Sequence, residues 1–196
     1  MVIRLATKEW FTARMSSCFL LPFSFSRLHE HQKRNHISLF AALCRDDMPL
    51  VRRVAAQNLG ELINRVAETS KEKGLFEGGL ITASILPLYI DLAGSAQDSI
   101  RLHMPANCML FGAQVVPLMQ KLDDPARDNI HNIIKSKIIP LIISCANDSS
   151  WRVRWTTASK FSGIVEAFKN FAGAMDVLIP AFESLLKDTE AEVSFT

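Results

Sequence analysis

The segment IIPLIISCANDSSWRVRWTTASKFSGI, residues 138–164, carries the clearest structural signal, because each of its halves is patterned as an amphipathic helix. Apolar residues in the first half have i, i+3, i+4, i+7 spacing, which places them on one helical face. They are Ile138, Leu141, Ile142 and Cys145. In the second half, Val153 and the residues four, eight and eleven positions later form a second such face. Between the halves lies a polar turn, where Ser149 is a candidate N-cap. The segment is therefore predicted to fold as helix, turn, helix.

The same pattern recurs along the chain. Apolar anchors equivalent to Val153 stand at Val51, Ile100 and Val193, which gives intervals of 49, 53 and 40 residues. A single helix pair cannot bury its apolar faces alone, whereas a stack of pairs buries them between neighbours. We therefore predict an all-α fold, an α-solenoid of stacked antiparallel helix pairs in an ARM-like superhelix.

The whole chain, residues 1–196, is predicted to be one repeat array. Its divisions are a partial repeat over about 1–30, a repeat over 31–80, a repeat with an insertion over 81–132, a repeat over 133–172 and a partial repeat over 173–196. The insertion, in 115–137, contains Pro117 and Pro125 and predicts either one additional helical turn or a longer connection. Pro105 falls within the second helix of its repeat, so this helix is expected to kink there or to begin late.

An acidic residue at the turn and an arginine six residues later recur at the same register. Asp46 precedes Arg52 by six residues, and Asp148 precedes Arg154 by six, while a third copy has Arg101 but lacks the acid. Because stacked repeats bring equivalent turns together, we predict a ladder of ion pairs from repeat to repeat. Its members are Asp46, Arg52, Arg101, Asp148 and Arg154. The alternative is a set of ordinary surface charges, each pair contributing about 0–1 kcal/mol.

Two helices per repeat, a period near 40 and Asp-x5-Arg at the turn make these units similar to HEAT repeats. Five blocks go further and resemble, in the same order, the scaffold (A) subunits of protein phosphatase type 2A. The blocks are EWFTARMSSC (9–18), DDMPLVRRVAAQNLGE (46–61), QDSIRL (97–102), SSWRVRW with ASKF (149–155 and 158–161) and LIPAFESLLKDTEAEV (178–193). The resemblance covers nearly the whole chain and places it between the end of the fourth repeat and the start of the eighth repeat of such a protein.

The resemblance implies a scaffold that has no active site and holds no cofactor or metal. It implies that the chain binds a regulatory B-type subunit and so directs phosphatase assembly and substrate choice. The catalytic subunit is expected to bind only through C-terminal repeats that are absent from this chain. The alternatives are another HEAT-repeat adaptor, such as a nuclear-transport receptor that binds through residues 58–65 and 160–170, or a truncated product without binding activity.

In the family that the chain resembles, the turns within successive repeats form the edge that regulatory subunits contact. The positions of this chain that match the edge are Asp47, Pro49, Arg52, Arg53, Gln97, Asp98, Arg101, Ser150, Trp151 and Arg152. Arg52 is expected to serve mainly the ladder, whereas Arg53 and Arg152 lie outside the ladder position and are expected to meet an acidic partner surface. Trp151 is interpreted as an exposed anchor for the partner, with local packing as the alternative. Trp155 is expected to pack against a neighbouring repeat.

The composition excludes several other classes of function. The formal net charge of +2 is too balanced to indicate a nucleic-acid-binding protein. The sequence contains no catalytic motif, and its four cysteines lack metal-ligand spacing, so we expect buried thiols in a reducing compartment. The histidine-rich segment 29–36 is predicted to be a solvated loop, with a metal site as the alternative. The apolar segment 17–25 is too short to span a membrane, and the protein is expected in the cytoplasm and also in the nucleus.

Overall fold

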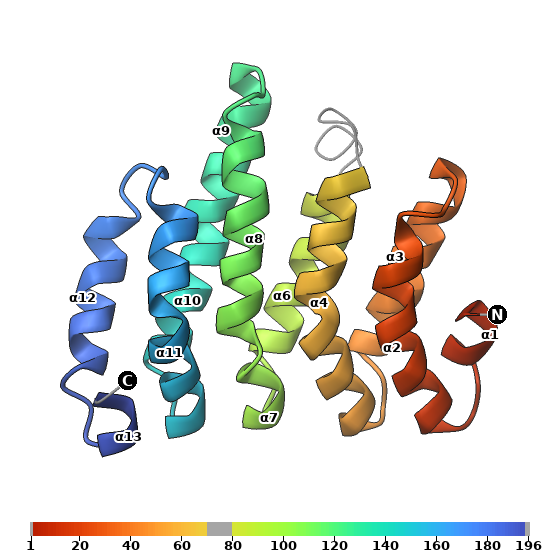
Figure 1. The fold of residues 1–196 in the computed structure, drawn as a ribbon, viewed down its shortest axis with the longest axis horizontal. Helices are drawn as coiled ribbons and strands as arrows, with labels where there is room; N and C mark the ends of the chain where they lie inside the picture. Colours follow the sequence, from red (N-terminus) through yellow and green to blue (C-terminus); the bar gives the residue numbers. More distant parts are fainter. Residues whose placement is uncertain (1, 70–79, 195–196) are drawn as a thin grey trace. The chain divides into compact units, whose positions relative to one another are not determined.

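The computed structural model describes residues 2–69 and 80–194, which fall into two compact units, Met1–Gly94 and Ser95–Thr196. Every regular element in these described ranges is a helix (Figure 1). Helices pack side by side within each unit, for example α2 (Phe11–Phe25) against α4 (Pro49–Thr69) and α8 (Met104–Met119) against α11 (Trp151–Phe168), and the described polar turns are short. The predicted all-α fold of the α-solenoid class is confirmed.

Within its described residues, the first unit has five α-helices and one π-helical segment. They are α1 (Val2–Ala6), α2 (Phe11–Phe25), α3 (Glu30–Cys44), α4 (Pro49–Thr69), the π-helix η1 (Leu80–Ile85) and α6 (Leu86–Ala93). Helix α2 packs against α4, and α3 packs against both of them. The face of α4 that begins at Val51 is fully buried in this packing, because its apolar residues recur at every turn of the helix.

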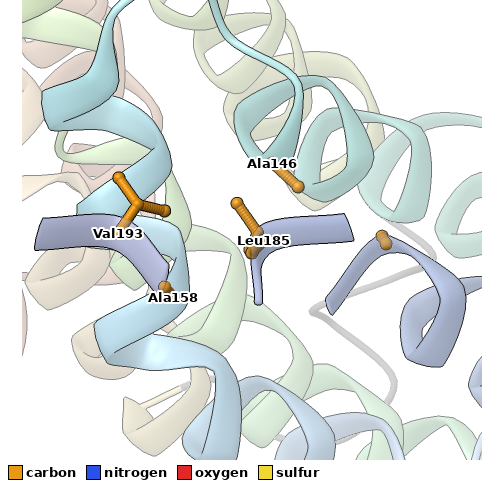
Figure 2. Packing of buried hydrophobic residues seen from close by; sticks show 5 residues of the cluster. Ala146, Ala158, Leu185 and Val193 are labelled. Carbon is orange, nitrogen blue, oxygen red and sulfur yellow. The ribbon is translucent and has the colours of Figure 1, made fainter. Parts of the chain in front are cut away.

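The second unit is arranged around α11, which packs against α8, α10 and α12. Its elements are α7 (Asp98–Arg101), α8 (Met104–Met119), α9 (Asp124–Ile133), the π-helix η2 (Ile134–Ile138), α10 (Ile139–Ala146), α11 (Trp151–Phe168), α12 (Met175–Leu185) and α13 (Ala191–Ser194). Figure 2 shows part of the core, where Leu185 of α12 and Val193 of α13 meet the small residues Ala146 and Ala158. Small side chains at these positions let successive helices approach closely.

The sequence pattern accounts for this packing. The four anchors Val51, Ile100, Val153 and Val193 are each at most 1% exposed. The residues four, eight and eleven positions after the first three anchors are all buried as well. Each helix therefore presents to its neighbours the apolar face that the 3.6-residue period predicts.

Prolines shape the helices of the second unit. Helix α7 ends at Arg101 and α8 begins at Met104, so Pro105 lies in the first helical turn, where its missing N–H costs little. The prediction that this helix begins late is confirmed. Pro125 also lies at a helix start, that of α9, and α9, η2 and α10 follow one another without a break. The additional residues in 115–137 therefore lengthen the first helix of the next repeat.

The prediction of a solvated loop at residues 29–36 is wrong, because α3 begins inside this segment. Gln32 Oε1 accepts a hydrogen bond from the His29 N–H at 3.3 Å, which helps to cap the helix start. Lys33 and His36 are buried on the inner face, and His36 Nε2 lies 3.1 Å from a backbone carbonyl oxygen of α2. These two polar residues occupy core positions of a helix, so the segment shows helical spacing without the expected apolar character.

Candidate partner-binding edge

Three arginines near helix starts form ion pairs with aspartates of the following repeat. The Nε–Oδ2 distances are 2.6 Å for Arg14–Asp46, 2.7 Å for Arg101–Asp148 and 2.6 Å for Arg154–Asp188. Each of these six side chains is at most 16% exposed. We refer to the three pairs as the arginine ladder, with one rung in the first unit and two in the second.

Each rung is fixed by the backbone as well as by charge. Arg101 Nη1 donates to the carbonyl of Ser95, six residues earlier, at 2.7 Å, while Nε and Nη2 bind both carboxylate oxygens of Asp148. Asp148 Oδ1 also accepts the Ser150 N–H at 2.8 Å. Equivalent bonds recur at the other two rungs. The arginine thus joins its own turn to the next turn through a bidentate, charge-assisted contact.

The aspartates of the ladder remain ionised into the acidic range. Burial alone would raise the pKa of Asp148, but the hydrogen bonds from Arg101 and the Ser150 N–H outweigh it and hold that pKa below its usual value. At Asp188 the hydrogen bond from Arg154 is the largest influence, and it lowers the pKa of the carboxyl. Both partners of each rung are therefore charged at neutral pH.

The residues expected in the ladder do not all form rungs. Those that do are Asp46, Arg101, Asp148 and Arg154. Arg52 instead donates through Nη1 to the carbonyls of its own turn, Asp46 at 2.7 Å and Asp47 at 3.0 Å. The carboxylate of Asp46 pairs with Arg14, which sequence analysis did not assign. The Asp-x5-Arg pattern does not identify Arg14, because Lys8 stands six residues before it, where other copies have the acid.

A second contact between repeats lies beside the middle rung. Ser150 Oγ donates to Asp98 Oδ2 at 2.9 Å, and Arg152 Nη1 lies 3.5 Å from the same oxygen. The hydroxyl of Ser150 is the main reason that the pKa of Asp98 lies below its usual value. Ser150 and Asp98, both expected at the partner-binding edge, are therefore largely engaged within the protein.

Four of the residues expected at the edge present their side chains to solvent. They are Asp47, Arg53, Trp151 and Arg152. The Arg152 guanidinium stacks on the Trp151 ring at 5.3 Å from the centroid. Pro49 begins α4 and is half-buried, and the side-chain oxygen of Gln97 is buried without a hydrogen-bond partner among the described residues.

Trp155, which is expected to pack against a neighbouring repeat, leaves 44% of its surface exposed. It follows Trp151 by one helical turn and lies on the same outward face of α11, whereas Val153 and Thr157 point into the core. Both indoles line a surface groove of about 480 Å³. Its other lining residues are Leu102, Arg152, Thr156 and Glu192.

The edge offers contacts for recognition and no reactive group. Within residues 2–69 and 80–194, no cluster of histidine, cysteine and carboxylate side chains could hold a metal ion. The four cysteines are buried and unpaired in disulfides, and burial raises the pKa of Cys18 and Cys145 to about 12. Thiols of this kind are poor nucleophiles at neutral pH. Among the described helices, none combines the length and apolar character needed to cross a bilayer.

Comparison with known proteins agrees with the repeat architecture. Residues 37–66 and 138–168 match the HEAT repeat family. A solved structure of a computationally designed armadillo repeat protein aligns with 99% of this chain and 76% of its own, with a TM-score of 0.54. At 16% sequence identity, this likeness concerns the fold alone.

Several curated proteins are similar to the chain in sequence. A probable PP2A regulatory subunit from Caenorhabditis elegans is 38% identical over 112 residues, which cover 57% of this chain and 17% of that protein. The PP2A regulatory (A-type) subunit of Schizosaccharomyces pombe is 33% identical over 164 residues, 82% of this chain and 24% of that protein. The chain thus spans about a quarter or less of the length of these relatives. These similarities identify it as a HEAT-repeat protein related to the A-type regulatory subunits of protein phosphatase 2A.

Proposed function

We propose that the chain acts as a scaffold segment in a phosphatase assembly of the PP2A type and binds a regulatory B-type subunit through its turn edge. By holding that subunit, it would direct assembly and substrate choice, while a catalytic subunit would be bound by other repeats. The similarity to proteins named as PP2A regulatory or scaffold subunits supports this role. The cytoplasm and the nucleus are the compartments that we propose for it.

The observation that carries the proposal is an exposed Trp–Arg pair on a turn that the arginine ladder holds rigid. Trp151 and Arg152 begin α11, and the turn just before them is tied to the preceding repeat by Arg101. Tryptophan and arginine are the residue types that most often dominate protein–protein interfaces. Because the turn is already ordered, a partner that binds there loses little conformational entropy from this side of the interface.

The second exposed cation of the edge is Arg53, on α4 of the first unit. It lies next to Arg52 in sequence but makes none of the bonds to the turn that occupy Arg52. Arg53 in the first unit and Arg152 in the second therefore both complement an acidic surface on the regulatory subunit. Such pairing at an interface rim mainly sets the association rate and the salt dependence of binding.

The test is capture of a purified regulatory B-type subunit by the immobilised intact chain. The double variant Trp151→Ala/Arg152→Ala should bind at least about tenfold more weakly, while its circular dichroism stays helical. Phe23→Ala is the matched control, since it truncates an exposed aromatic in the last turn of α2, at the end of that helix opposite Arg14. Equal capture by the wild type and the double variant would show that this edge is not the binding surface.

A further inference from the structure

The groove beside Trp151 is assembled from three successive helix pairs of the second unit. Leu102 follows α7, Glu192 lies on α13, and the four other lining residues come from the first turns of α11. In Figure 1, α7, α13 and the first turns of α11 lie at the lower end of this unit. We call this surface the tryptophan groove.

The floor of the tryptophan groove is apolar and partly open to water. Trp151 and Trp155 remain 38% and 44% exposed, although Val153, Phe161, Ile164 and Phe168 of the same helix are buried. Two large exposed indoles one turn apart are unusual on a soluble helix, because each leaves on the order of 100 Å² of surface that a partner could remove from water. The groove therefore fits a bulky apolar side chain inserted between the two rings.

The guanidinium of Arg152 lies at one end of the groove, and Glu192 also lines the groove. Arg152 is 62% exposed, and its contact with Asp98 at 3.5 Å is much longer than the 2.6–2.7 Å contacts of the ladder arginines. It also stands in the first turn of an 18-residue helix, where the macrodipole favours a negative charge. A carboxylate near the start of α11 would thus meet an exposed guanidinium whose contacts within the protein are the long pairing with Asp98 and the stacking on Trp151.

We propose that the tryptophan groove binds a short segment of the regulatory subunit in which a bulky apolar residue follows an acidic one. The apolar side chain lies between Trp151 and Trp155, and the carboxylate contacts Arg152. This inference rests on the proposed function for the identity of the partner. It adds Trp155 as a residue that selects the partner segment, beyond the turn residues themselves.

The probe for the groove is a fluorescein-labelled peptide with the sequence Glu-Glu-Phe-Glu-Glu, titrated with the intact chain and followed by fluorescence anisotropy. A second peptide with alanine in place of the phenylalanine removes only the apolar anchor. We expect the phenylalanine peptide to bind at least about tenfold more tightly than the alanine peptide. Trp155→Ala should abolish that difference, Trp155→Phe should keep most of it, and the control Phe23→Ala should leave it unchanged.

The inference is overturned if the wild type binds the two peptides equally, or binds neither, or if Trp155→Ala leaves the difference intact. The same preparations are assayed for capture of the regulatory B-type subunit. If Trp155→Ala still captures the regulatory subunit, the groove does not determine partner choice, and the proposed function is unaffected. Absence of capture by the wild type counts against the proposed function, and the peptide titration still reports on the groove.

Discussion

Replacement of Arg101 by methionine tests whether the arginine ladder stabilises the stack. The substitution keeps an unbranched apolar side chain and removes the guanidinium, which makes three hydrogen bonds of 2.7–2.8 Å to Ser95 and Asp148. Of the described hydrogen bonds to the Asp148 carboxylate, the one from the Ser150 N–H then remains. The carboxylate would then be mostly buried with no guanidinium bonded to it, although the charge of Arg154 still acts on it.

The expected loss follows from the burial of the pair. Arg101 and Asp148 are 15% and 10% exposed, so the rung lies between a surface ion pair, which contributes about 0–1 kcal/mol, and a fully buried one, whose disruption costs about 3–5 kcal/mol. We expect Arg101→Met to lower the free energy of unfolding by about 2–3 kcal/mol. Arg53→Met is the matched control, because Arg53 is exposed and lies outside the ladder, and it should change stability by less than about 0.5 kcal/mol.

Urea unfolding followed by tryptophan fluorescence measures the effect in the second unit. A Trp10→Phe background leaves Trp151 and Trp155 as the only tryptophans, since the chain has three. With a slope of about 2 kcal/mol/M, the midpoint should fall by about 1–1.5 M urea in Arg101→Met. A shift no larger than that of Arg53→Met would refute the reasoning and reduce the rung to an ordinary surface ion pair.

Three further predictions follow from the same packing and charges. Gly112→Ala should lower the free energy of unfolding, measured in urea, by about 1–3 kcal/mol, because the new Cβ would lie 2.4 Å from the buried Phe168 ring. Gly94→Ala is the control and should be nearly neutral, because its Cβ would meet no atom closer than 3.4 Å. The difference in unfolding midpoint between wild type and Arg101→Met should be constant above about pH 5 and shrink below about pH 4. The pKa of Asp148 is lowered in the folded state, so the pair stabilises the protein fully above the pKa of the unfolded state and loses its effect as the pH falls through the pKa of the folded state. A difference that is unchanged at about pH 3 would contradict this. At about pH 8 the four cysteines should resist iodoacetamide in the folded chain and react in urea, because burial raises their pKa values. Mass spectrometry measures the labelling, and rapid labelling of the native protein would argue against the buried packing of these thiols.

The repeat architecture could be predicted from the sequence because it depends on apolar periodicity. An anchor such as Val153 and its partners along α11 must be apolar whatever the neighbouring repeats contain, so the pattern is local and readable. The late start of α8 was one of two alternatives for Pro105, because a proline costs little in a first helical turn but kinks or breaks a helix interior.

The details of the ladder depended on which repeat faces which, and that information is not local. Asp-x5-Arg spacing indicates that both groups stand at the turn, but Arg154 pairs with the carboxylate of Asp188 in the following repeat and donates to the backbone carbonyl of its own Asp148. The same limit explains Trp155. Its position one turn after Trp151 places both indoles on one face of α11, and only the neighbouring helices decide whether that face is covered.

The ladder and the tryptophan groove are joined by one continuous set of contacts. Arg101 holds Asp148, Asp148 holds the Ser150 N–H, and the Ser150 hydroxyl holds Asp98, whose carboxylate also restrains Arg152 at the rim of the groove. Each rung thus fixes the first turn of the next helix, which is the turn that carries the exposed edge. In a repeat protein, the rotation between neighbouring repeats sets the spacing of any surface that crosses several of them. The buried charges are therefore best understood as the elements that keep the groove, with its walls from three helix pairs, in a shape that a partner segment can recognise.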